Sequence, residues 1–148
     1  PDKNKRSAVM PLLYIAQQEY GYVTRDAIGE IASLLGIDPT QVVSIVGFYS
    51  LYYDKQEGQN RIQICTDLPC ALRGSEQFAD QVCEHLGVKM GETTEDQFFV
   101  VEEVMCLAAC DKSPMFQVQN STGISYHENQ SLETVKDLTD QLRAEAKE

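Results

Sequence analysis

Four of the five cysteines form two short pairs, and this arrangement constrains the chain more than any other feature of its sequence. Four residues separate Cys65 from Cys70, three separate Cys106 from Cys110, and thirty-five lie between the two pairs. Two short cysteine pairs on two loops can meet in space and offer four thiolates to one metal centre. We therefore expect the two loops to converge in the folded chain.

Each pair follows a segment with the pattern of a β-strand. Residues 61–65 alternate polar and apolar side chains, and residues 98–104 are rich in β-forming residues. Thiolates at the ends of two such strands favour a [2Fe–2S] cluster. Arg73 and Lys112 flank the two pairs and could offset their negative charge locally, whereas Asp67 and Asp111 would add to it. The predicted ligands are Cys65, Cys70, Cys106 and Cys110.

The spacing alone leaves other interpretations open. Structural zinc also takes four cysteines, although zinc sites favour the tighter C-x2-C loop. Two disulfides are possible in principle, but the chain is long and poor in cysteine for a secreted disulfide scaffold. Four unrelated buried thiols would not be expected to fall in two pairs. The fifth cysteine, Cys83, shares the apolar face of a predicted helix and is expected to be a core residue.

The residues around the cysteines resemble a known family. The segments C-T-D-L-P-C-A-L-R-G and E-V-M-C-L-A-A-C-D-K-S-P-M are similar to the thioredoxin-like [2Fe–2S] ferredoxins, which include the small iron–sulfur subunits of NADH:quinone oxidoreductase (respiratory complex I). The resemblance extends from about residue 8 to residue 142. One position departs from the family, which usually carries glycine where this chain has Ala108. An alanine there would be strained if the loop required a positive φ.

The resemblance implies an α+β chain. We expect a small helical bundle over residues 1–57, followed by a thioredoxin-like α/β domain with a four-stranded sheet over residues 58–148. The implied role is an electron-transfer subunit without a catalytic site of its own. It would sit beside a flavoprotein subunit that holds FMN and oxidises NADH. Similar subunits serve NAD-linked hydrogenases and formate dehydrogenases, and a zinc-stapled interaction module is the alternative from another class.

Composition and motifs narrow the choice further. The net charge of −11 argues against nucleic-acid binding, which needs clustered Lys and Arg. Neither a G-x-G-x-x-G nor a phosphate-binding G-x-x-x-x-G-K-[ST] motif is present, and no C-x-x-C supports a thiol carrier. His85 and His127 lie far from the cysteine pairs in sequence and are expected at the surface.

The same features bear on location. No apolar run approaches ~20 residues, so no membrane insertion is expected. No signal peptide is visible, which favours a compartment where thiols stay reduced. The resemblance implies the cytoplasmic side of a membrane-bound complex in a bacterium, or the mitochondrial matrix side in a eukaryote.

Hydrophobic periodicity predicts three short helices before residue 54. Their expected signals are Ser7 and Gly21 for the first, Thr24 and Gly36 for the second, and Asp38-Pro39 for the third. The second part should run strand, helix, strand, strand, strand, helix. These elements are 61–65, 75–86 with Ser75 as its cap, 98–104, 115–119, 124–126 and a helix capped by Ser131. Four aromatic residues fall within 47–53, and we expect some to pack inward and others to face a partner.

Overall fold

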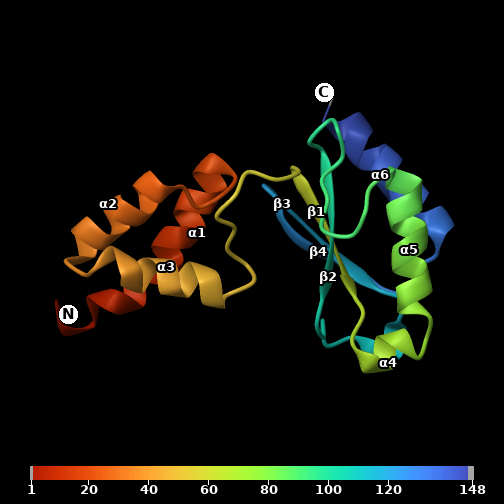
Figure 1. Ribbon diagram of the computed structural model, residues 1–148, viewed down its shortest axis with the longest axis horizontal. Helices are drawn as coiled ribbons and strands as arrows, with labels where there is room; N and C mark the ends of the chain where they lie inside the picture. Colours follow the sequence, from red (N-terminus) through yellow and green to blue (C-terminus); the bar gives the residue numbers. More distant parts are fainter. Residues whose placement is uncertain (1, 147–148) are drawn as a thin grey trace. The chain divides into compact units, whose positions relative to one another are not determined.

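The computed structural model describes residues 2–146, and the chain divides into two compact units, residues 1–56 and 57–148. Figure 1 shows a helical first unit and a second unit built on a sheet. The helices of the first unit are η1 (Asp2–Ala8), α1 (Val9–Tyr20), α2 (Arg25–Leu35) and α3 (Pro39–Phe48). The second unit contains β1 (Asn60–Cys65), α4 (Leu68–Ala71), α5 (Ser75–Leu86), β2 (Phe99–Val104), η2 (Cys110–Lys112), β3 (Phe116–Asn120), β4 (Gly123–His127) and α6 (Leu132–Glu145).

Side chains at the predicted positions begin two of the helices in the first unit. The Thr24 hydroxyl accepts a hydrogen bond from the Ala27 N–H at 3.1 Å, and an Asp38 carboxylate oxygen accepts one from the Thr40 N–H at 2.9 Å. The predicted cap at Ser7 is wrong. A 3₁₀ helix (η1) runs through that residue, so α1 begins one residue later and has Ala8 at its cap without a side-chain hydrogen bond.

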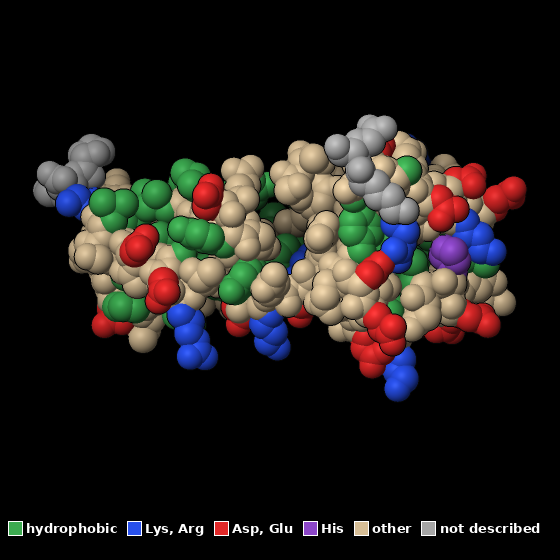
Figure 2. All heavy atoms as spheres, turned by 90° about the horizontal axis from the view of Figure 1, so that it is seen from above, with side chains coloured by type: hydrophobic (Ala, Val, Ile, Leu, Met, Phe, Trp, Pro, Cys, Tyr) green, Lys and Arg blue, Asp and Glu red, His purple; other side chains and the backbone are tan. Residues whose placement is uncertain are grey.

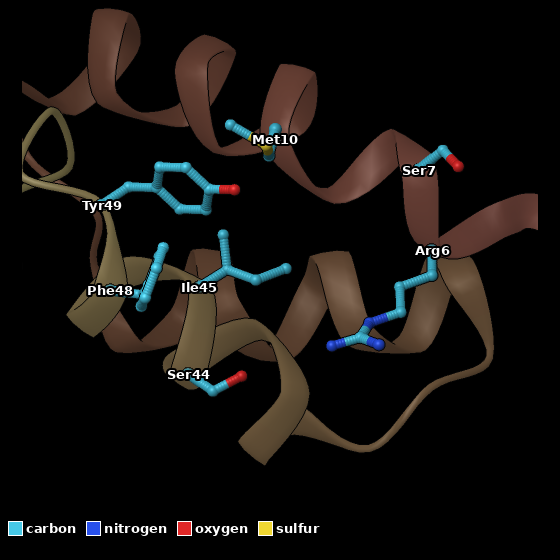
Figure 3. A pocket seen from close by; sticks show the side chains of 7 residues that line it. All are labelled: Arg6, Ser7, Met10, Ser44, Ile45, Phe48 and Tyr49. Carbon is cyan, nitrogen blue, oxygen red and sulfur yellow. The ribbon is translucent and has the colours of Figure 1, made fainter.

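The first unit buries its own apolar core. The fully buried members are Val9, Leu13 and Val42, with Val23 and Ala32 beside them. The aromatic segment divides as expected: Tyr52 is buried and its hydroxyl donates to the Met10 carbonyl oxygen at 3.0 Å, whereas Phe48 is 79% exposed. Phe48 and Tyr49 line a pocket together with Met10 and Arg6 (Figure 3). Hydrophobic side chains also gather on the surface of this unit, at the left of Figure 2.

The second unit has the strand order β2-β1-β3-β4. Strand β1 pairs in parallel with β2 and antiparallel with β3, which in turn pairs antiparallel with β4. Helices α5 and α6 cover one face of the sheet (Figure 1). This mixed four-stranded sheet with a strand–helix–strand start and a hairpin–helix end is the predicted thioredoxin-like arrangement.

The strands alternate their side chains between the two faces. Ile62 and Ile64 belong to the core shared with α5 and α6, which is closed by Phe99, Phe116 and Val135. On the opposite face, Gln63 donates to Glu102 at 3.0 Å and accepts from Gln117. Strand β1 therefore presents apolar side chains to the helices and hydrogen-bonded polar side chains on the opposite face of the sheet.

Two glycines, Gly58 and Gly74, lie just before the first residues of β1 and α5. Gly58 lies so close to β2 that a Cβ built on it would be 2.5 Å from the Phe99 carbonyl carbon. The predicted cap at Ser75 is wrong, because Gly74 takes the cap position with φ +86 and Ser75 becomes the first helical residue. The Ser75 hydroxyl is buried.

Across residues 2–146, none of the helices combines the length and apolar character that a membrane span requires.

Candidate metal centre

The first cysteine pair is held by regular structure. Cys65 is the last residue of β1 and Cys70 lies in the short helix α4, with exposed fractions of 1% and 0%. Asp67 caps α4, because its carboxylate accepts a hydrogen bond from the Leu68 N–H at 2.9 Å. The sequence predicted a loop between the two cysteines. The structure turns its second half into a helix that begins with Pro69 in its first turn, a position where proline is favoured.

The second pair lies on a more open loop. Cys106 follows the end of β2 and is exposed, and Cys110 opens η2 and is half-buried. Their Sγ atoms are 3.8 Å apart. Between them, Ala108 adopts φ +60, and its N–H donates to the Cys106 sulfur at 3.4 Å. The alanine therefore occupies the left-handed region that glycine tolerates without strain.

The parallel pairing of β1 and β2 explains why the two pairs meet. The register places Cys65 beside Val104, so both strands end at the same edge of the sheet and both loops leave from there. Cys65 and Cys70 form a buried cluster with Met115, and Cys110 packs against it. The Cys70 side chain hydrogen-bonds Cys65 and lies within electrostatic range of Cys110. The structure thus clusters Cys65, Cys70 and Cys110, and Cys106 joins them through its contact with Cys110.

Backbone and side-chain hydrogen bonds join the two loops. The Cys65 N–H donates to the Met115 carbonyl oxygen at 3.3 Å. The Ser113 hydroxyl donates to the Cys70 carbonyl oxygen at 3.4 Å, and the Arg73 Nε donates to the Ser113 carbonyl oxygen at 3.2 Å. From the sequence, Arg73 was expected only as a nearby charge, and Ser113 and Met115 were not expected at the site. Their position directly after the second pair was the available signal.

Two thiols of this site, Cys70 and Cys110, favour their neutral form. Burial first, and then the hydrogen bond with Cys65, raise the pKa of Cys70 to about 11. The pKa of Cys110 is also raised, mainly by the neighbouring Cys106 thiol and then by burial. Metal ligands must be thiolates, so metal binding here releases protons. Lys112 gives little help to these sulfurs, because its ammonium group pairs with Glu128 at 2.8 Å.

The donor set suits an iron–sulfur cluster. Two sulfurs bound to one tetrahedral metal at ~2.3 Å lie about 3.8 Å apart, as the Cys106 and Cys110 sulfurs do. Within residues 2–146, no group of three or more His, Cys, Asp or Glu side chains has the geometry to hold a metal ion. A [2Fe–2S] cluster takes its four ligands as two pairs, one for each iron, and two pairs are what the loops present.

The remaining cysteine and the two histidines lie elsewhere. Cys83 belongs to the apolar core between the sheet and α5. His85 is in the last turn of α5 and hydrogen-bonds Thr139 at 3.2 Å. His127 is half-buried and stacks on Phe116 with ring centroids 4.9 Å apart, and burial lowers its pKa. None of the three is part of the thiol cluster.

The fold and the site together define a thioredoxin-fold protein that carries two cysteine pairs at one edge of its sheet. The family model described as thioredoxin-like [2Fe–2S] ferredoxin matches residues 1–143, and the chain belongs to this family.

Relatives named as NADH-quinone oxidoreductase subunits share much of the sequence. The chain is 41% identical over 120 residues to NADH-quinone oxidoreductase subunit 2 of Thermus thermophilus, and the match covers 81% of this chain and 66% of that protein. It is 36% identical over 141 residues to an NADH-quinone oxidoreductase subunit of Rhizobium meliloti, and this match covers 95% of the chain and 82% of that protein.

A solved structure shares the fold. A chain of the NAD⁺-reducing [NiFe]-hydrogenase in the air-oxidized state superposes with a TM-score of 0.77 at 14% sequence identity. The match covers 93% of this chain and 23% of that chain. At this level of identity the comparison establishes the common fold.

Proposed function

We propose that this chain is an iron–sulfur electron-transfer subunit of an NADH:quinone oxidoreductase. One [2Fe–2S] cluster would be held by Cys65, Cys70, Cys106 and Cys110. The observation that carries the proposal is the convergence of these four thiols at one edge of the sheet, in a chain of the thioredoxin-like [2Fe–2S] ferredoxin family. The names of the relatives supply the parent complex.

The cluster supplies one-electron chemistry when it is bound. The chain's own residues give it an asymmetric environment. Cys65 and Cys70 are buried beside Met115 and hold the inner side away from water, whereas Cys106 is exposed. Electron exchange with a partner is therefore favoured on the side of the second pair.

The proposed partner is a flavoprotein subunit that carries FMN and the NADH site. This chain would reside in the multi-subunit complex on the cytoplasmic side of a bacterial membrane, or on the matrix side in a mitochondrion. The alternative assembly is an NAD-linked hydrogenase or formate dehydrogenase. Co-purification from the source cells separates these assemblies, because quinone reductase subunits, a hydrogenase subunit or a formate dehydrogenase subunit would accompany the chain.

The cluster itself is tested on purified protein. We expect visible absorption, two irons and two sulfides per chain, and an EPR signal after reduction with dithionite. Cys65→Ser or Cys106→Ser should strip or severely perturb the cluster, whereas Cys83→Ala should leave the spectrum unchanged. A colourless protein that contains zinc and no sulfide would instead support the zinc-stapled module. Bleaching by Cys83→Ala would show that the ligand set is wrong.

The two units are further proposed to be separate domains, with the boundary near residues 57 and 58. Asp54, Lys55 and Gln56 are exposed, whereas Gly58 packs on β2. Limited proteolysis should cut first within 54–57 and release two protease-resistant fragments. Cleavage inside the helices of the first unit before the boundary is cut would contradict this division.

A further inference from the structure

Ser113 connects the second cysteine loop to the first cysteine pair. It lies three residues after Cys110, and it is 4% exposed. Its carbonyl oxygen is fixed by Arg73 at 3.2 Å, and its hydroxyl donates to the Cys70 carbonyl oxygen at 3.4 Å. The side chain is thus held against Cys70, on the buried side of the site.

The Ser113 hydroxyl can rotate between two acceptors. A 3.4 Å bond to the Cys70 carbonyl oxygen is long for a hydroxyl donor, for which about 2.7–2.8 Å is usual. The Cys70 sulfur is the second acceptor, because the side chains of Ser113 and Cys70 also lie within hydrogen-bonding reach of each other. An anionic sulfur accepts a stronger hydrogen bond than a neutral carbonyl does.

We propose that Ser113 is a positioning residue that donates a hydrogen bond to the Cys70 sulfur in the loaded protein and thereby raises the reduction potential of the cluster. The proposal rests on the proposed ligand set. Reduction adds one electron, taken from the reductant, and no atom enters or leaves. The added negative charge is spread over the ligand sulfurs, so a donor at Cys70 stabilises the reduced form more than the oxidised form.

The two pairs would each have one such donor, but of different kinds. At Cys106 the donor is the backbone N–H of Ala108, which every substitution except proline keeps. At Cys70 it is a side-chain hydroxyl, which Ser113→Ala removes while it leaves the carbonyl contact with Arg73 in place. The inner pair is therefore the one whose donor can be tested directly.

The test is an EPR-monitored redox titration of the full chain with dithionite. We expect Ser113→Ala to keep its iron and sulfide but to lower the equilibrium constant for reduction about tenfold, a shift of about 59 mV to more negative potential for one electron. Ser113→Thr keeps a hydroxyl and should stay nearer the wild-type value. Thr139→Val is the matched control, because it removes a buried hydroxyl beside His85, at the far end of α5 from Cys70.

The outcomes are distinguishable. If the alanine variant loses its iron, Ser113→Gly, which also lacks the hydroxyl and adds no volume, is titrated in its place. A hydroxyl-free variant that retains the cluster and titrates with wild type and Thr139→Val would overturn the role of Ser113. A wild-type protein that binds no [2Fe–2S] cluster would overturn the proposed function itself.

Discussion

Arg73 and Ser113 stand forty positions apart in sequence, yet the Arg73 Nε donates to the Ser113 carbonyl oxygen at 3.2 Å. Arg73 follows the helix that carries Cys70, and Ser113 follows the second cysteine pair. The bond therefore connects the two chain segments that carry the proposed cluster ligands. Its loss should loosen the second loop without touching any thiol.

We expect Arg73→Gln to release the cluster faster. The loss of one hydrogen bond, about 1 kcal/mol, corresponds to about a fivefold faster bleaching of the visible absorption in the presence of an iron chelator. Arg25→Gln is the control, because Arg25 is also exposed but begins α2 in the helical unit. Equal bleaching rates for both variants would show that the Arg73 bond does not hold the loop.

Ala108→Gly should stabilise the site. A non-glycine residue at φ +60 costs roughly 1–2 kcal/mol of stability, and glycine removes this cost. Glycine also gives the unfolded chain more conformational freedom, which offsets part of the gain, so the net stabilisation is about 0.5–1 kcal/mol. The neighbouring Ala109 has φ −128, so Ala109→Gly should destabilise instead. Denaturant titration that follows the visible absorption measures both; a shift in the same direction for both variants would contradict the strain at Ala108.

Gly58→Ala should destabilise the sheet unit by about 2 kcal/mol or more, because its methyl carbon would fall 2.5 Å from the Phe99 backbone. Gly29→Ala is a contrasting change in α2, because a Cβ built on Gly29 would meet no atom within 4 Å beyond its own helix backbone and chain neighbours. It should stabilise the helical unit by up to about 1 kcal/mol. Amide hydrogen exchange reports each unit separately. Unchanged protection of the β1 and β2 amides in Gly58→Ala would refute the close packing.

Alkylation should rank the thiols of the metal-free protein. With a pKa of about 11, only about one Cys70 thiol in a thousand is ionised at pH 8, and the side chain is also buried. Cys106 is exposed and should react with iodoacetamide first. The rate at Cys70 should keep rising tenfold per pH unit up to about pH 11, as more thiolate forms. Peptide mass spectrometry follows each site, and early labelling of Cys70 at pH 8 would contradict its burial.

The local signals of the sequence predicted most of the fold. Thr24, Asp38 and Ser131 all cap helices as expected, because a side-chain oxygen before an apolar stripe acts within one turn. Ser75 carried the same signal and was misjudged. The left-handed Gly74 takes the cap position there, so Ser75 enters the helix and is buried. Whether Gly74 or Ser75 caps the helix depends on how the segment packs against the rest of the fold, which the neighbouring residues alone do not determine.

Some features of the candidate site could be predicted from the sequence, and others could not. The parallel pairing that brings Cys65 and Cys106 to one sheet edge follows from the strand–helix–strand order, so their meeting was predictable. Ala108 was expected to be strained only if its loop required a positive φ, and the structure has that positive φ. The contact of Ser113 with Cys70 was not predictable, because it depends on how the second loop folds back over α4.

Strand β1 is hydrogen-bonded on both sides, by β2 and by β3, and Cys65 is its last residue. Its sulfur is thereby positioned by the sheet before any iron arrives, whereas Cys106 rides on a loop that water can reach. The site therefore has one half fixed by the sheet and another half on an exposed loop. Cys65 would therefore hold the cluster from a rigid part of the fold, and Cys106 would hold it from the part of the site that solvent reaches.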